Sequence, residues 1–130
     1  MFKILIADES REFRKFIRRL SESETDLEVV GEATSGHELL TLARQLKPDV
    51  ALVDFALSGM GGLEGARRIK EELPGTRVIL LSLVDETAVR DAAMRYGADA
   101  FLNKGAPISE MFKQIRGQKM KAFTGGSAGL

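Results

Sequence analysis

Val50-Ala51-Leu52-Val53-Asp54 is an unbroken apolar run that stops on a carboxylate. Three further apolar runs also stop on polar groups: residues 3–7 at Asp8 and Glu9, residues 78–81 at Ser82, and residues 100–103 at Lys104. If the four runs are neighbouring parallel strands, three carboxylates, a hydroxyl and an ammonium meet at one edge of a sheet. Such a cluster is suited to the transfer of a phosphoryl group onto an aspartate.

Longer stretches with helical periodicity separate these runs. Five sets of apolar residues recur at intervals of three and four, the pattern of one buried helix face: Phe13, Phe16, Ile17 and Leu20; Leu39, Ala43 and Leu46; Ala66, Ile69 and Leu73; Val89, Ala92, Ala93 and Tyr96; and Ile108, Met111, Phe112 and Ile115. With residues 27–33 as a further strand, five strands alternate with five helices. This order predicts an α/β fold in which a doubly wound, five-stranded parallel sheet carries helices on both faces.

The composition of the 130 residues limits the classes of function. The 19 lysines and arginines equal the 19 aspartates and glutamates in number, so no overall charge favours nucleic acid or an anionic membrane. There is no cysteine, and hence neither a disulfide nor a thiolate metal site. No apolar run approaches the roughly 20 residues that a membrane-spanning helix needs. We therefore expect a soluble cytoplasmic domain that binds neither nucleic acid nor membrane directly.

The regular pattern ends after Ile115. Glycine and other small residues dominate the sequence beyond it, a composition that is typical of linkers. We expect one domain over residues 1–118, followed in residues 119–130 by a flexible tail or the start of a linker.

The polar groups at the strand ends have a charge problem that a metal ion would solve. Asp8, Glu9 and Asp54 cannot lie close together as bare anions without raising the pKa of at least one of them. Mg²⁺ relieves such repulsion, because it binds a few carboxylate oxygens and keeps several waters. Lys104 would add a fixed positive charge, and the Ser82 hydroxyl could donate to a phosphoryl oxygen. Asp54, on the run predicted to be central, is the best-placed nucleophile.

Four segments form an ordered set around these residues: Ile6-Ala7-Asp8-Glu9, Leu52-Val53-Asp54-Phe55-Ala56-Leu57-Ser58-Gly59-Met60-Gly61-Gly62-Leu63, Leu81-Ser82, and Gly97-Ala98-Asp99-Ala100-Phe101-Leu102-Asn103-Lys104. In this order and spacing they resemble the receiver domain of two-component response regulators. Two further segments resemble receivers of the type that often precedes a helix-turn-helix DNA-binding domain: Val29-Val30-Gly31-Glu32-Ala33 and Leu46-Lys47-Pro48-Asp49.

The resemblance implies a flavodoxin-like fold with strand order 2-1-3-4-5. It also implies that Asp54 accepts a phosphoryl group from a histidine kinase or a phosphotransfer protein. Mg²⁺ would be held by Asp8, Glu9, Asp54 and the carbonyl of Ala56. In this reading the chain is not an enzyme, since it promotes only its own phosphorylation and dephosphorylation.

The resemblance further implies a switch. After phosphorylation, Ser82 and Phe101 would move and change the surface formed by the fourth helix, the fifth strand and the fifth helix. That surface would control an output, most simply transcription through a helix-turn-helix domain absent from this chain. The resemblance also allows a homodimer to form on activation, although no residue pattern indicates one.

Some residues depart from the family pattern. Glu9 stands where the second acid is usually aspartate, and its carboxylate lies one methylene further out, which alters the expected metal geometry. Phe101 has no phenolic hydroxyl, so it can report switching only through packing. Gly105 stands where many receivers have a cis-proline.

Alternative readings remain open from the sequence. The chain could be a pseudo-receiver that binds a partner without phosphorylation, or an aspartyl-phosphate phosphohydrolase. The hydrolase reading is weakened by Ala56, because such enzymes usually place a second acid there as the general acid. The basic residues of the first helix form either a solvated face or a docking surface for the kinase: Arg11, Arg14, Lys15, Arg18 and Arg19.

Overall fold

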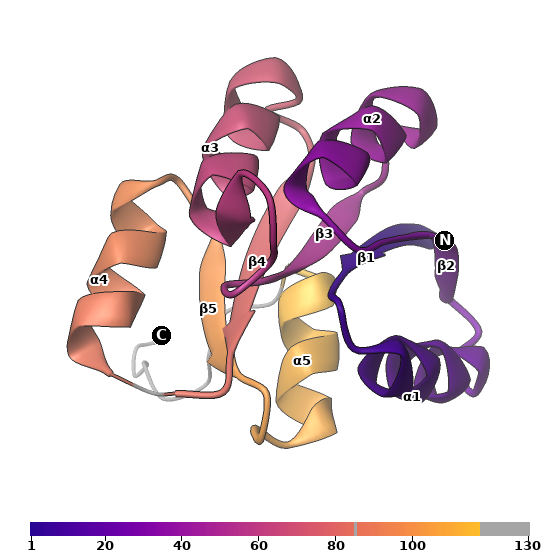
Figure 1. Cartoon of the computed structure of the whole chain (residues 1–130). Helices are drawn as coiled ribbons and strands as arrows, with labels where there is room; N and C mark the ends of the chain where they lie inside the picture. Colours follow the sequence, from indigo (N-terminus) through magenta and orange to yellow (C-terminus); the bar gives the residue numbers. More distant parts are fainter. Residues whose placement is uncertain (85, 118–130) are drawn as a thin grey trace, which may run out of the picture.

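The structure, a computed structural model, describes residues 1–84 and 86–117. Five parallel strands form one sheet, and five helices connect them (Figure 1). The strands are β1 (Phe2–Ala7), β2 (Leu27–Ala33), β3 (Val50–Asp54), β4 (Arg77–Ser82) and β5 (Ala100–Asn103). The helices are α1 (Arg11–Glu22), α2 (Gly36–Leu46), α3 (Gly61–Glu72), α4 (Thr87–Arg95) and α5 (Ile108–Ile115). The tail predicted for residues 119–130 lies outside the described residues. No helix among the described residues has the length and apolar character needed to cross a membrane.

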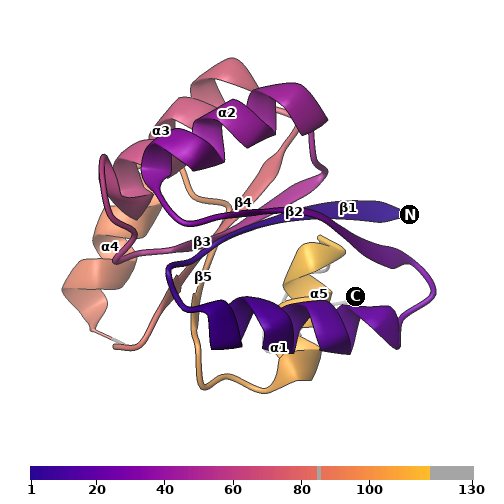
Figure 2. The ribbon, with the colours of Figure 1, turned by 45° about the vertical axis from the view of Figure 1, so that its right-hand side comes forward.

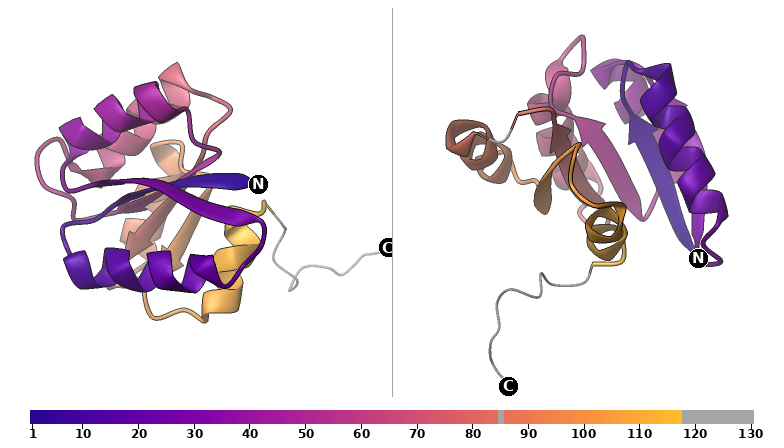
Figure 3. Two further views of the ribbon diagram at one scale, coloured as in Figure 1. Left: turned by 90° about the vertical axis from the view of Figure 1, so that its right-hand side faces the viewer. Right: turned by 90° about the horizontal axis from the view of Figure 1, so that it is seen from below.

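The helices cover both faces of the sheet. One layer contains α2, α3 and α4, and the other contains α1 and α5 (Figure 2 and Figure 3). Successive side chains of a strand point to opposite faces, so Ala51 and Val53 pack in the first layer and Leu52 in the second. Because both faces of the central strands are buried, their sequences are continuously apolar rather than alternating.

The strand order β2-β1-β3-β4-β5 places the ends of distant segments side by side. Ala7 pairs with Val53, so Asp8 and Asp54 follow on adjacent strands. At the other side of β3, β4 pairs with β5 through Ser82 and Asn103, and Lys104 comes next. The order of the strands reverses between β1 and β3, and ligands of such sheets bind beyond the carboxyl ends at this reversal.

The predicted fold class and strand order are confirmed, and the predicted strands differ from the observed ones by one residue at most at either end. Two residues that were expected on buried helix faces are instead exposed. Phe16 is 52% exposed because it lies at the margin of the apolar stripe of α1, turned by about 60° from Phe13. Tyr96 is 38% exposed and lies beyond α4, which ends at Arg95 before Gly97 turns the chain with a φ of 93°.

Candidate functional site

Lys104 joins two aspartates at the carboxyl edge of the sheet. Its Nζ lies 2.6 Å from Asp8 Oδ2 and 3.5 Å from Asp54 Oδ2. The side chains of Asp8, Asp54 and Lys104 are 2%, 14% and 11% exposed, respectively. Little water therefore screens the three charges, and they interact more strongly than charges on the surface. The structure thus brings together the three charged residues that the sequence placed at the ends of β1, β3 and β5.

Asp8 is fixed by its backbone as well as by its ion pair. Its N–H donates to the carbonyl of Ala33 at 2.9 Å, which extends the pairing of β1 with β2 by one residue. Its Oδ1 accepts the N–H of Ser10 at 2.8 Å, and the Ser10 hydroxyl in turn accepts the N–H of Phe13 and caps α1. Asp8 Oδ2 is buried, and the Lys104 ammonium lies beside it.

The loop after Asp54 holds its carboxylate at the carboxyl edge of the sheet. Asp54 Oδ1 accepts the N–H of Ala56 at 3.2 Å, and the Asp54 carbonyl accepts the N–H of Leu57 at 3.1 Å. The loop then enters α3, whose second residue, Gly62, packs directly against this backbone. A Cβ atom added to Gly62 would lie 2.3 Å from the Asp54 carbonyl oxygen and 3.0 Å from Phe55 Cα. Only glycine fits there without displacing Asp54.

Phe13 of α1 gives Lys104 a third contact. The Lys104 ammonium lies 4.6 Å from the centre of the Phe13 ring, within the range of a cation–π interaction. The apolar periodicity of α1 predicted that Phe13 faces inward but did not indicate its contact with a charged group. The sequence likewise marks Gly62 only as part of the loop after Asp54, because a close backbone approach leaves no pattern in one sequence.

Ser82 ends β4, which pairs with β3, and Phe101 lies on β5, the next strand of the sheet. Ser82 is 4% exposed, and its hydroxyl accepts the N–H of Val84 at 3.1 Å. Phe101 is 5% exposed and packs in the same layer as α2, α3 and α4, where the Arg90 guanidinium lies 4.9 Å above its ring. Among the described residues neither side chain forms a hydrogen bond or ion pair with Asp54, so their predicted roles in a switch stay predictions.

Metal-binding capacity rests on the oxygens around Asp8 and Asp54. One ammonium faces two carboxylates, and a phosphoryl group would add about −1.5 to −2 further charge. Carboxylate and carbonyl oxygens are the ligands that Mg²⁺ prefers, and Asp8 and Asp54 supply carboxylate oxygens here. Glu9 is exposed, and no group of three His, Cys, Asp or Glu side chains converges within residues 1–84 and 86–117. The residues therefore fit an ion that takes few protein ligands and keeps its waters.

The basic face expected on α1 is interrupted. Arg11, Lys15 and Arg19 are exposed, as predicted. Arg14 and Arg18 instead bind opposite oxygens of the Glu32 carboxylate, each at 2.8 Å. Burial raises the pKa of the Glu32 carboxyl, but the hydrogen bonds from both arginines outweigh this effect and hold the pKa below its ordinary value. The prediction was wrong for Arg14, whose side chain is 13% exposed, because β2 places an acid beside it that the helical pattern alone cannot reveal; the Arg18 side chain is 42% exposed despite its ion pair.

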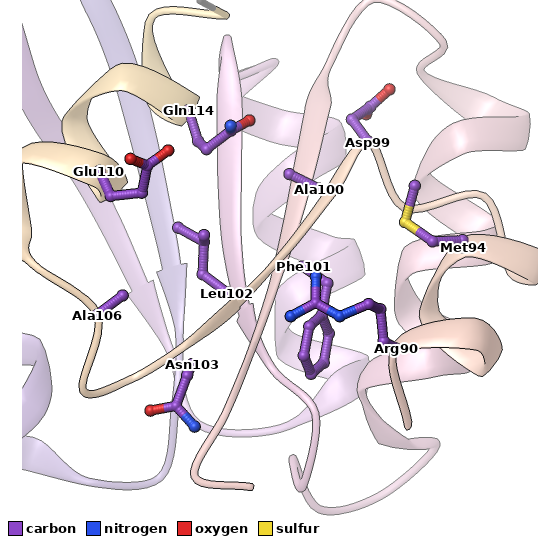
Figure 4. A pocket seen from close by; sticks show the side chains of 10 residues that line it. All are labelled: Arg90, Met94, Asp99, Ala100, Phe101, Leu102, Asn103, Ala106, Glu110 and Gln114. Atoms are coloured by element: carbon purple, nitrogen blue, oxygen red, sulfur yellow. The ribbon is translucent and has the colours of Figure 1, made fainter. Parts of the chain in front are cut away.

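A hollow of about 510 Å³ lies on another surface, over α4, β5 and α5. Figure 4 shows Phe101 and Leu102 on its floor, Arg90 and Met94 from α4 on one side, and Glu110 and Gln114 from α5 on the other. Glu110 Oε2 is buried and accepts no hydrogen bond in the described residues. The hollow thus combines an apolar floor with an unpaired acceptor, and Phe101 connects it to the interior.

An aspartate at the end of a central strand, next to a second aspartate and a buried lysine on a 2-1-3-4-5 sheet, defines the receiver class of signalling domains. Residues 4–116 match the family model of the response regulator receiver domain, and the chain belongs to this family. It is 37% identical over 116 residues to the response regulator GacA of Pseudomonas aeruginosa and 33% identical over 114 residues to the transcriptional regulatory protein YxjL of Bacillus subtilis. These alignments cover 89% and 88% of this chain but 54% and 52% of those relatives, so the chain spans about half their length.

Solved structures agree with this assignment. The signal receiver domain of the putative response regulator NarL from Mycobacterium tuberculosis superposes with a TM-score of 0.82 at 32% sequence identity. The match covers 90% of this chain and 98% of that domain. The chain is therefore a two-component response regulator receiver domain in sequence and in fold.

Proposed function

We propose that this receiver accepts a phosphoryl group on Asp54 from the phosphohistidine of a histidine kinase or a phosphotransfer protein, in the cytoplasm. The observation that carries the proposal is the position of Lys104, which faces both Asp8 and Asp54 from within a largely buried site. An isolated surface aspartate would have no such partner. A buried cation held beside the acceptor carboxylate supplies positive charge where the phosphoryl oxygens would arrive.

The transfer needs few groups from the protein. An oxygen of the Asp54 carboxylate attacks phosphorus, an oxygen–phosphorus bond forms, and the nitrogen–phosphorus bond of the donor breaks. The leaving nitrogen keeps the electron pair of that bond, and the donor ring departs as neutral imidazole when its other nitrogen carries a proton or when water supplies one. Catalysis of this step is largely a matter of position and charge, and Asp54 is positioned here by the Ala56 N–H and by the packing of Gly62.

Several groups are suited to hold the product. Lys104 would pair with one phosphoryl oxygen, and the Ser82 hydroxyl, at the end of the adjacent strand, would donate to another. Asp8 and Asp54, with Glu9 and the Ala56 carbonyl nearby in the chain, would hold Mg²⁺. The ion, when bound, would neutralise negative charge on the transferred group.

The output side of the proposal concerns Phe101 and the hollow above it. Movement of Ser82 toward the phosphoryl group would remove its bond to the Val84 N–H and alter the segment that leads into α4. Phe101 lies both in the interior layer of α4 and on the floor of the hollow, so repacking of its ring would change the α4–β5–α5 surface. We propose that this surface controls a transcriptional output through a helix-turn-helix domain, or dimer formation on activation. Support comes from the family and from relatives such as the transcriptional regulatory protein YxjL, of whose length the match covers 52%.

A docking surface for the phosphodonor is available on α1. Phe16 is an exposed aromatic side chain, and the exposed Lys15 and Arg19 lie on the same helix. Aromatic side chains surrounded by charged ones are common at the centres of protein interfaces. We propose that Phe16 contacts the kinase or phosphotransfer partner when its phosphohistidine meets Asp54.

Phosphorylation with a small donor tests the proposal without a kinase. The chain is incubated with acetyl phosphate and Mg²⁺, and the intact protein is weighed. We expect an adduct of about 80 Da, the mass of one phosphoryl group, that is absent from Asp54→Asn. Asp49→Asn is the matched control, because Asp49 lies at the opposite end of β3 and accepts the N–H of Lys3.

Other outcomes separate the alternative functions. An adduct that persists in Asp54→Asn but is lost in another aspartate variant would refute Asp54 as the acceptor. Continuous consumption of acetyl phosphate without a lasting adduct would favour an aspartyl-phosphate phosphohydrolase. No adduct at any Mg²⁺ concentration would favour a pseudo-receiver that acts only by binding a partner.

A further inference from the structure

Arg14 connects α1 to the acidic end of β1. Its guanidinium is largely buried, with 13% of the side chain exposed. Nη1 donates to the carbonyl oxygen of Asp8 at 2.7 Å, and Nε donates to Glu32 Oε1 at 2.8 Å. The guanidinium therefore joins the backbone of Asp8 to the adjacent strand β2.

The Asp8 carbonyl needs such a donor. β1 ends at Ala7, so this oxygen lies beyond the pairing of the sheet, and a buried carbonyl without a partner is unfavourable. The direction of the Asp8 carbonyl also sets the plane of the peptide that joins Asp8 to Glu9. Whatever holds this carbonyl consequently determines the direction in which Glu9 leaves the sheet.

We propose that Arg14, braced by Glu32, is a positioning residue that orients the acidic pair Asp8 and Glu9 for Mg²⁺. This inference rests on the proposed function, since it assigns a role in the same site. Arg14 touches neither the acceptor aspartate nor a phosphoryl group. It acts through the Asp8 carbonyl, in the way that outer residues around a metal orient the ligands themselves.

Arginine is required here by geometry. The two acceptors of Arg14, a carbonyl and a carboxylate, are reached by different nitrogens of one planar group. A lysine ammonium is a single point of charge and cannot hold both acceptors at the same fixed angle. Arg14→Lys therefore keeps the charge and removes the orientation, which distinguishes positioning from simple electrostatic attraction.

Arg18 provides a matched control. It binds the other oxygen of the same carboxylate, Glu32 Oε2, at 2.9 Å through Nε, and its remaining contact is with the Val29 carbonyl at 3.5 Å. Both arginines thus lose an ion pair with Glu32 when changed to glutamine. Only Arg14→Gln also releases the Asp8 carbonyl.

The test is a Mg²⁺ titration of the full chain without phosphodonor, followed by the amide NMR signals of Asp8, Glu9 and Ser10. We expect Arg14→Gln and Arg14→Lys to bind Mg²⁺ about tenfold more weakly than the original protein, and Arg18→Gln to bind it within about twofold. Glu32→Gln keeps Arg14 but weakens the ion pair that holds it, so its Mg²⁺ affinity should lie between that of Arg14→Gln and that of Arg18→Gln. Urea unfolding in the presence of a chelator shows whether each variant is folded under the conditions of the titration.

Different results would overturn the inference about Arg14 and the proposed function. If Arg14→Gln and Arg18→Gln weaken Mg²⁺ binding equally, Arg14 is only part of a structural ion pair and the inference is overturned. Unchanged Mg²⁺ binding in Arg14→Lys would also overturn it, as would the absence of Mg²⁺ binding by the original protein. If Arg14→Gln is unfolded, the comparison of Arg14→Lys with Arg18→Gln decides. A failure of the acetyl phosphate reaction in the original protein would overturn the proposed function, while the difference in Mg²⁺ binding between the variants would stand.

Discussion

Replacing Gly62 by alanine should damage the site through the backbone of Asp54. In a helix, this change ordinarily stabilises a protein, by at most about 1 kcal/mol, because glycine loses more conformational entropy on folding. Here the new methyl group would lie 2.3 Å from the Asp54 carbonyl oxygen and 3.0 Å from Phe55 Cα. Both obstacles are backbone atoms next to a buried strand, so they cannot rotate away as a side chain can.

The size of the effect follows from the competition between these terms. Excess volume in a packed interior lowers the free energy of unfolding by about 1–3 kcal/mol, and the higher helix propensity of alanine offsets at most about 1 kcal/mol of this loss. We expect Gly62→Ala to lower the free energy of unfolding by about 2 kcal/mol, roughly a 30-fold change in the folding equilibrium. The displaced Asp54 should also react more slowly with acetyl phosphate.

Gly65 gives the matched control on the same helix. A Cβ atom added at Gly65 would approach only Leu39 Cδ2, at 3.0 Å, which is the end of a flexible side chain. Gly65→Ala should therefore be near neutral. Urea unfolding followed by far-ultraviolet circular dichroism measures both variants, and mass spectrometry measures adduct formation. Equal stabilities for the two variants would refute the argument that the α3 backbone is held in place against Asp54.

Three further changes test other contacts of the site. Phe13→Leu keeps the apolar volume but removes the aromatic ring beside Lys104, and because a cation–π contact is worth about 0.5–2 kcal/mol, adduct formation with acetyl phosphate should slow several-fold. An unchanged rate would show that the contact does not contribute to the reaction. Phe16→Ala should leave the acetyl phosphate reaction intact while slowing transfer from the phosphorylated partner; parallel loss in both reactions would argue against docking at Phe16. Glu32→Gln should lower stability by about 1 kcal/mol at pH 7. Because the pKa of Glu32 is lowered in the folded state, its contribution is present above the ordinary value of 4.5 and is lost as the pH falls through the lowered pKa, so the urea midpoints of the two proteins should converge in acid.

The strands were predictable because each buried strand is a short apolar run between turn residues, and this pattern is local. The order of the strands came from the resemblance, and the structure confirms it. The meeting of Asp8, Asp54 and Lys104 also followed, since the carboxyl ends of parallel strands lie at one edge of the sheet.

The remaining contacts depend on tertiary packing. The roles of Arg14 and Glu32 require that the inner face of α1 lie against β2, and no local pattern links residues 18 positions apart. Phe16 looked like a core residue because the period of α1 includes it, yet the sheet covers only the centre of the stripe. The close approach of Gly62 to Asp54 depends on where α3 packs against the end of β3, which composition and periodicity do not encode.

One turn of α1 faces three environments, with Phe13 against Lys104, Arg14 against Asp8 and Phe16 in solvent. A partner that binds Phe16 therefore acts on the same rigid helix that orients the acidic pair. If such binding changes the affinity for Mg²⁺ by some factor, thermodynamic linkage requires Mg²⁺ to change the affinity for the partner by the same factor. Mg²⁺ would then change the affinity for the phosphodonor, besides taking part in the transfer itself.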